Sequence, residues 1–179
     1  MQFQSLPLLD NPHFVIRPLA EQDIAHWAHY LQMEGVYEHT SWSHPTESDL
    51  RRYLGNELSQ DPSGQLRLAI ATRSENQLAG TVGFHTLSPI NRTAELAYDL
   101  HPSFWGRGLA QQAGQELVRW AHLDAGIIRV QATVLESNAR SIATLERMLF
   151  VREGLLRSYK LVRGKPGNFY MYAHVAVAQ

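Results

Sequence analysis

The run Phe104-Trp105-Gly106-Arg107-Gly108-Leu109-Ala110 constrains the fold most, because it joins two segments with different hydrophobic periods. Before it, side chains over residues 94–100 alternate with the two-residue period of a β-strand. After it, apolar residues recur at helical spacing from about Ala110 to Leu123. The chain is therefore predicted to pass from a strand, through a turn with two glycines, directly into a helix.

This glycine turn has the properties of a phosphate site. The first amides of a helix lack internal acceptors and carry the positive end of the helix dipole, so anions bind there. Gly106 and Gly108 allow close approach and left-handed backbone angles, and Arg107 adds a positive charge. The P-loop pattern is absent, and Gln111 stands where the dinucleotide fingerprint has its third glycine. The turn thus predicts a pyrophosphate ligand without identifying the molecule that carries it.

Several separated motifs resemble those of the GCN5-related N-acetyltransferases (GNAT), in the same order. The turn resembles the family's acetyl-coenzyme A loop, Gln/Arg-x-x-Gly-x-Gly/Ala, from Gly108 onward. Trp105 in the first position is typical of the branch that includes the RimJ/RimL-type ribosomal-protein N-terminal acetyltransferases. Residues 14–24 are similar to the family's opening strand and helix, and residues 138–154 to its Asn-x-x-Ser and Leu-Glu-Lys-Leu-Gly-Phe-x-x-Glu-Gly segments. The resemblance spans nearly the whole chain and is weakest over residues 25–75.

The resemblance implies an α/β (α+β) fold in a single domain over residues 1–179. Its mixed, mostly antiparallel sheet would have six or seven strands and about four flanking helices, with a V-shaped splay between strands 93–100 and 129–135 that receives acetyl-coenzyme A. The implied cofactor-binding residues are Leu100, His101, Trp105, Gly106, Arg107, Gly108, Leu109, Ala110, Gln111, Asn138 and Ser141. Asn138 has a simpler alternative role as a helix cap.

Periodicity and turn signals place the remaining elements. Helices are predicted over 20–32, 46–59 and 138–149, and the second begins with the capping box Thr46/Asp49. Strands are predicted over 66–72, 78–87, 93–100, 129–135, 152–161 and 168–177, and residues 35–45 form an aromatic loop. Leu149 replaces the family's glycine, which predicts an unusual turn, and Leu145 replaces the tyrosine that many members carry as the acid for the thiolate.

Acetyl transfer to an amine requires a neutral amine, a polarised carbonyl and a proton for the leaving thiolate. Glu95 is the predicted base, directly or through a water, unless it is only a solvent-facing strand residue. Asp99 is the second candidate base, unless it only pairs with a cation. A backbone N–H near Leu100 would polarise the carbonyl. Ser141 is the predicted donor to the thiolate, and Tyr98 and Tyr159 are the alternatives.

The acceptor amine is predicted to contact the aromatic loop. The candidate substrate residues are Tyr37, His39, Trp42 and Tyr98. His39 and His44 flank Trp42 but have no third ligand nearby in the sequence, so no metal site is predicted.

Composition narrows the class of protein. The net charge of −1 argues against general binding to nucleic acid or anionic membranes. The 179 residues include no cysteine, which excludes a cysteine nucleophile, and no apolar run approaches the length of a membrane span. The expected location is cytoplasmic.

The predicted function is acetyl-coenzyme A-dependent N-acetylation of a primary amine, with direct transfer in a ternary complex. The acceptor would be a protein N-terminus, as the resemblance implies, or a small amine. The alternative is a non-catalytic acyl-coenzyme A sensor, for which Leu145 and Leu149 are the best support. Homodimers are common in this fold, although no segment identifies an interface.

Overall fold

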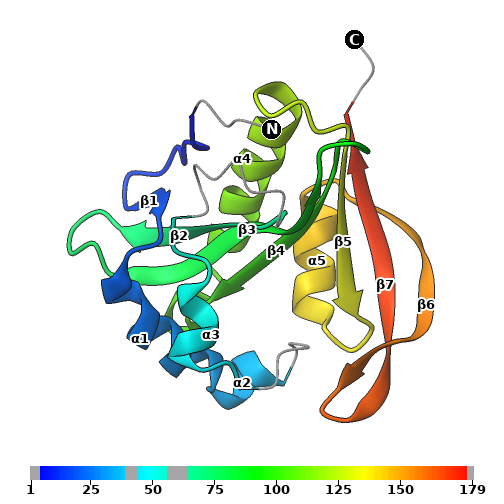
Figure 1. The fold of residues 1–179 in the computed structure, drawn as a ribbon, viewed down its shortest axis with the longest axis horizontal. Helices are drawn as coiled ribbons and strands as arrows, with labels where there is room; N and C mark the ends of the chain where they lie inside the picture. Colours follow the sequence, from blue (N-terminus) through cyan, green and yellow to red (C-terminus); the bar gives the residue numbers. More distant parts are fainter. Residues whose placement is uncertain (1–4, 39–43, 56–63, 177–179) are drawn as a thin grey trace.

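The computed structural model describes residues 5–38, 44–55 and 64–176, and these form one seven-stranded sheet with flanking helices (Figure 1). The strand order is β1-β2-β3-β4-β5-β7-β6, and every neighbouring pair is antiparallel except β4 and β5. The strands are β1 (Phe14–Pro18), β2 (Leu66–Thr72), β3 (Leu78–Ser88), β4 (Thr93–Leu100), β5 (Arg129–Leu135), β6 (Val151–Val162) and β7 (Lys165–Val175). The helices are α1 (Glu21–Leu31), α2 (Glu34–Tyr37), α3 (Glu47–Arg51), α4 (Leu109–Leu123) and α5 (Ala139–Arg147), with a 3₁₀ turn, η2 (Pro102–Phe104).

Helices cover both faces of the sheet. Helix α4 lies on one face, and α1 and α3 lie on the other (Figure 1). Leu96 and Leu100 of β4 belong to the same buried cluster as Leu117 of α4 and Leu145 of α5. A second cluster gathers α1 and α3 around Trp27 and other apolar side chains. Because side chains alternate along a strand, β4 presents alternate residues to the α4/α5 face and to the α1 face.

The sheet splits between β4 and β5, as predicted. The two strands pair only at Thr93–Arg129, Ala94–Val130 and Glu95–Gln131. Beyond Glu95 the strands diverge, so the last part of β4 and the last part of β5 form the two arms of a V. Backbone groups on the facing edges of these arms are left for something other than a neighbouring strand.

Most element positions agree with the sequence predictions, and the Thr46/Asp49 capping box is present, with Thr46 N donating to Asp49 Oδ2 at 2.8 Å. Helix α3 is shorter than predicted: it ends at Arg51, residues 52–55 form a turn, and residues 56–59 lie outside the described ranges. Part of the predicted aromatic loop is helical, as α2. Its four residues are too few to give a periodic signal.

The prediction of an unusual turn at Leu149 was wrong. Leu149 adopts the left-handed conformation that glycine favours, with φ of 64°. Phe150 N donates to Leu145 O at 3.0 Å, and Leu149 N donates to Glu146 O at 3.0 Å, which is the usual hydrogen-bond pattern of a glycine-terminated helix. The leucine side chain is 74% exposed, so the turn is kept without a steric clash in the core.

Candidate active site

The divergence of β4 and β5 opens a cavity of about 670 Å³ that reaches both faces of the sheet. Tyr98, Ser141 and Leu145 line it on the α4/α5 face. Glu95 and Asp99, at alternate positions of β4, line it on the α1 face. A molecule held on one face can therefore meet a second molecule that enters from the other.

The glycine turn forms the mouth of this cavity at the N-terminus of α4. Gly106 and Gly108 both line it, and both have positive φ, 73° and 71°. Gly108 is the N-cap residue, and no atom lies within 4 Å of a Cβ built on Gly106. The first intrahelical bond is Gln112 N to Gly108 O, at 3.0 Å, so the preceding amides of α4 have no acceptor within the helix. This geometry suits a pyrophosphate.

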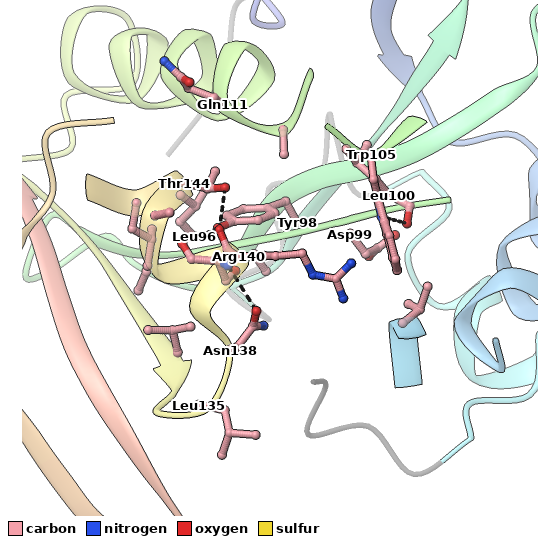
Figure 2. Close-up of a pocket in the computed structure, with 18 of the residues that line it drawn as sticks. Leu96, Tyr98, Asp99, Leu100, Trp105, Gln111, Leu135, Asn138, Arg140 and Thr144 are labelled. Atoms are coloured by element: carbon pink, nitrogen blue, oxygen red, sulfur yellow. Dashed lines mark hydrogen bonds between the residues drawn. The ribbon is translucent and has the colours of Figure 1, made fainter. Parts of the chain in front are cut away.

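Trp105 connects three elements around the cavity rather than only bordering the glycine turn. Its indole Nε1 donates to Leu100 O at 2.9 Å (Figure 2). The Arg140 guanidinium of α5 lies 3.9 Å from the centre of the Trp105 ring and donates to Gly35 O of α2 at 3.1 Å. A Cβ on Gly35 would come within 3.1 Å of the indole, so only glycine allows this packing without displacement. Trp105 thereby fixes the end of β4 relative to α2 and α5.

Two of the predicted cofactor-binding residues, Leu100 and His101, differ in position. His101 N donates to Ala79 O of β3 at 2.9 Å, and His101 O accepts from Phe104 N at 3.0 Å. Its ring stacks on His26 with centroids 5.3 Å apart, away from the cavity lining, and burial lowers its pKa, helped by the His26 and His29 charges. Both backbone groups of His101 are therefore already bonded. Alternation along β4 directs the N–H of Leu100 into the gap instead.

Two hydroxyl groups line the cavity together with Leu145, the residue that replaces the tyrosine of many family members. Tyr98 OH and Ser141 Oγ are 2.8 Å apart. Burial is the main cause that raises the pKa of Tyr98 to about 12, so its hydroxyl stays protonated at neutral pH. Ser141 N donates to Asn138 Oδ1 at 3.1 Å, which confirms the capping role of Asn138 (Figure 2). The chain thus places O–H groups where Leu145, buried and apolar, cannot donate.

Glu95 lies on the α1 face among polar partners from β5 and β6. Thr133 Oγ1 donates to Glu95 Oε1 at 2.8 Å, and Lys160 Nζ lies 3.7 Å from the same oxygen. The Glu95 side chain is 14% exposed. It is therefore not a free surface carboxylate.

Asp99 pairs with a cation, Arg67, which is the alternative that the sequence analysis gave for this residue. Arg67 Nη2 lies 2.5 Å from Asp99 Oδ2, which also accepts from Thr81 Oγ1 at 2.7 Å. Tyr30 OH donates to the other oxygen, and burial followed by the Asp99 charge raises the pKa of Tyr30 well above its ordinary value. Asp99 already has three partners, which suits a structural role better than proton transfer.

His85 is a cavity residue that the sequence analysis missed. It lines the cavity with Glu95 and Lys160, at a register shift of β3 between Phe84 and Thr86. Burial lowers the pKa of its imidazole, partly opposed by the Glu95 charge. A single histidine in a strand gives no distinctive signal in one sequence. The register shift next to Glu95 depends on pairing with β4, which local periodicity does not contain.

The predicted substrate residues do not form one group. Tyr37 lies at the end of α2, where its ring stacks on His44, with ring centres 4.0 Å apart, and Arg163 Nη1 donates to its carbonyl oxygen at 2.9 Å. It does not line the cavity, whereas Tyr98 does, on the α4/α5 face. His39 and Trp42 lie outside the described residues.

Within the described ranges, no cluster of three or more His, Asp or Glu side chains has a geometry that could hold a metal ion. No helix in those ranges has both the length and the apolar character needed to span a membrane.

The site and the fold define an acetyltransferase. The chain belongs to the GNAT family, because residues 13–151 match the family model described as Acetyltransferase (GNAT) domain. It is therefore an enzyme of the acyltransferase class.

Relatives with known names agree with this assignment. The chain is 27% identical over 186 residues to the uncharacterized N-acetyltransferase YoaA of Bacillus subtilis, covering 94% of this chain and 97% of YoaA. It is 25% identical over 134 residues to the ribosomal-protein-serine acetyltransferase of Escherichia coli, covering 75% and 74%. The solved structure of RimL, a ribosomal L7/L12 α-N-protein acetyltransferase in complex with coenzyme A, superposes with a TM-score of 0.81 at 22% identity over 94% of this chain and 97% of that one, which shows the shared fold.

Proposed function

We propose that this enzyme transfers the acetyl group of acetyl-coenzyme A to the α-amine of a protein or peptide N-terminus. The observation that carries the proposal is the cavity that crosses the sheet at the β4–β5 splay, with a glycine-lined helix N-terminus at one mouth and Glu95 on the opposite face. Relatives named as ribosomal-protein acetyltransferases support a protein acceptor, and a small primary amine is the alternative.

The donor would be held on the α4/α5 face. Gly106, Gly108 and the first amides of α4 fit a pyrophosphate, because the two glycines open the approach and the amides have no helical acceptor. Asn138 and Ser141 would contact the donor from α5, on the other arm of the V. When bound, acetyl-coenzyme A supplies a thioester whose acetyl group is the one transferred.

Residues of this chain would act on the acceptor amine, the thioester carbonyl and the leaving thiolate from opposite sides. Glu95 would hold the acceptor amine on the α1 face, because its carboxylate borders the cavity there. The Leu100 N–H would polarise the carbonyl at the gap. The Ser141–Tyr98 hydroxyl pair would donate a proton on the α5 face, where the two oxygens are 2.8 Å apart.

The test is amine-dependent release of free thiol from acetyl-coenzyme A, with calorimetric binding of coenzyme A in parallel. The acceptor panel contains peptides with free N-termini, amino-acid derivatives and polyamines. Release with peptides supports the proposal, and release only with small amines favours the alternative acceptor. Tight coenzyme A binding without release on any amine would contradict the proposed transfer and favour a sensor.

A further inference from the structure

His85 occupies a special position on β3, at the level of Glu95. Strands β3 and β4 pair regularly up to Phe84–Leu96, and the next pair is Thr86–Glu95, so His85 is an extra residue in the ladder. Such bulges redirect a side chain and are frequent beside active sites. Here the redirected imidazole lines the cavity together with Glu95, Thr133 and Lys160.

The His85 ring is also chemically available. In the part of the chain that the structure describes, neither ring nitrogen has a hydrogen-bond partner, whereas Asp99 has three and Glu95 is bonded to Thr133. A half-buried polar ring that borders a cavity and has no partner can accept a proton from a molecule that enters it.

We infer that His85 is the catalytic residue that accepts the proton of the acceptor amine, with Glu95 as its electrostatic partner. This inference rests on the proposed function. Starting from the ammonium form of the acceptor, the transfer forms one C–N bond, breaks one C–S bond and removes two protons from the acceptor nitrogen. His85 takes the first proton on the α1 face, before the amine attacks, and passes it to solvent. The nitrogen loses the second proton as the C–N bond forms, and the Ser141–Tyr98 pair gives one proton to the leaving sulfur on the α5 face and is reprotonated in turn, so that the net products are the amide, the free thiol and one proton.

The charges around His85 determine what it can deprotonate. Burial lowers its pKa most, and Arg67 of β2, Lys160 of β6 and Arg52 after α3 lower it further, while among the described residues Glu95 of β4 alone raises it. The imidazole is therefore neutral at pH 7, as a base must be, but it is a weak base. An N-terminal α-amine has a pKa of about 7.7–8.0, whereas a lysine amine has one of about 10.4.

The two kinds of amine differ in how readily a neutral imidazole deprotonates them. A histidine with an ordinary pKa of about 6.5 lies roughly four units below a lysine amine but little more than one unit below an α-amine. Deprotonating lysine is thus disfavoured by a factor of roughly 10⁴, against about 20 for an α-amine. Lowering the His85 pKa disfavours both amines further and keeps this difference. The difference comes from the amines themselves, so an imidazole base works more readily on an α-amine than on a lysine side chain at neutral pH.

The experiment combines kinetics with histidine NMR on the full chain. In His85→Gln, kcat/KM for a peptide α-amine should fall by about 100-fold or more, and the acid limb of the pH profile should lose its histidine inflection. Coenzyme A affinity should stay unchanged. His29→Gln, at an exposed position of α1, is the matched control and should keep the wild-type profile.

A second readout needs no turnover. NMR titration should give a His85 pKa below the ordinary histidine value in the wild-type protein, and a still lower value in Glu95→Gln. A peptide with a free α-amine should also react far faster than a matched peptide with an acetylated N-terminus and one lysine.

The outcomes separate the two proposals. Wild-type thiol release with an unchanged rate and pH profile in His85→Gln would overturn the role of His85 and leave the proposed function standing. A His85 ring that is protonated at pH 7 would also overturn it. No thiol release by the wild-type enzyme on any amine would overturn the proposed function and the His85 inference together.

Discussion

Removing Arg67 should destabilise the protein strongly, because it leaves the charge of Asp99 buried without its counter-ion. The side chains of Arg67 and Asp99 are 6% and 8% exposed, and they are joined at 2.5 Å. Breaking one partner of such a pair costs about 3–5 kcal/mol of unfolding free energy. Arg67→Met keeps much of the aliphatic stem and removes the charge. For a chain of this length, the loss should lower the thermal midpoint by about 6–20 °C.

The assay is thermal and urea unfolding followed by circular dichroism. A double variant, Arg67→Met with Asp99→Asn, removes both charges and keeps one amide oxygen as an acceptor for either Tyr30 or Thr81. It should recover at least half of the lost free energy, because no uncompensated charge remains. Arg119→Met breaks an exposed pair on α4, in which the arginine side chain is 57% exposed, and should leave the midpoint unchanged.

Two results would refute this reasoning. If Arg67→Met lost less than about 1 kcal/mol, the Asp99 charge would not depend on Arg67 for its compensation. If the double variant were no more stable than Arg67→Met alone, the loss would come from packing around the arginine stem rather than from charge.

Three further predictions address the site. Gly108→Val should weaken coenzyme A binding at least 10-fold in calorimetry, while Gly55→Val, at another positive-φ glycine with open space around it, should leave affinity unchanged; equal affinities would remove Gly108 from the donor site. Glu95→Gln should lower the rate most below the pKa of the amine, where the acceptor is an ammonium ion that the Glu95 carboxylate would hold. An equal reduction at every pH would contradict the proposal that Glu95 holds the acceptor. The folded state raises the pKa of Tyr98 from 10.0 to about 12, so its contribution to stability is intact below pH 10 and is lost as the pH rises to 12, by up to about 2.7 kcal/mol. Tyr98→Phe should reduce that alkaline loss in urea unfolding, and an unchanged loss would show that Tyr98 ionises normally.

The local elements could be predicted because their signals are local. The pattern before and after Gly106 and Gly108 defined β4 and α4, and both glycines adopt the left-handed angles expected of them. The same kind of signal failed at Leu149. The sequence argument assumed that only glycine completes the turn, but an exposed leucine also tolerates the left-handed angle, at a modest cost in free energy.

The site was harder to predict because it depends on contacts between distant segments. The pairing of Arg67 with Asp99 joins residues 32 positions apart, and Lys160 approaches Glu95 from β6. His85 reaches the cavity through a bulge that exists only in the pairing of β3 with β4. Neither hydrophobic period nor turn chemistry contains such information, so the sequence did not predict the partners of Glu95 and Asp99 on the α1 side of the cavity.

The alternation of side chains along β4 has a consequence for how this enzyme could change its substrate. Tyr98 and Leu100 belong to the face that would bind the acetyl donor, while Glu95 and Asp99 belong to the face that would bind the acceptor amine. Under the proposed function, the two substrates are recognised by separate sets of positions on a single strand. Mutations that retune the acceptor can accumulate on one set without disturbing the other, so a new specificity can evolve, or be engineered, while the supply of acetyl groups stays intact.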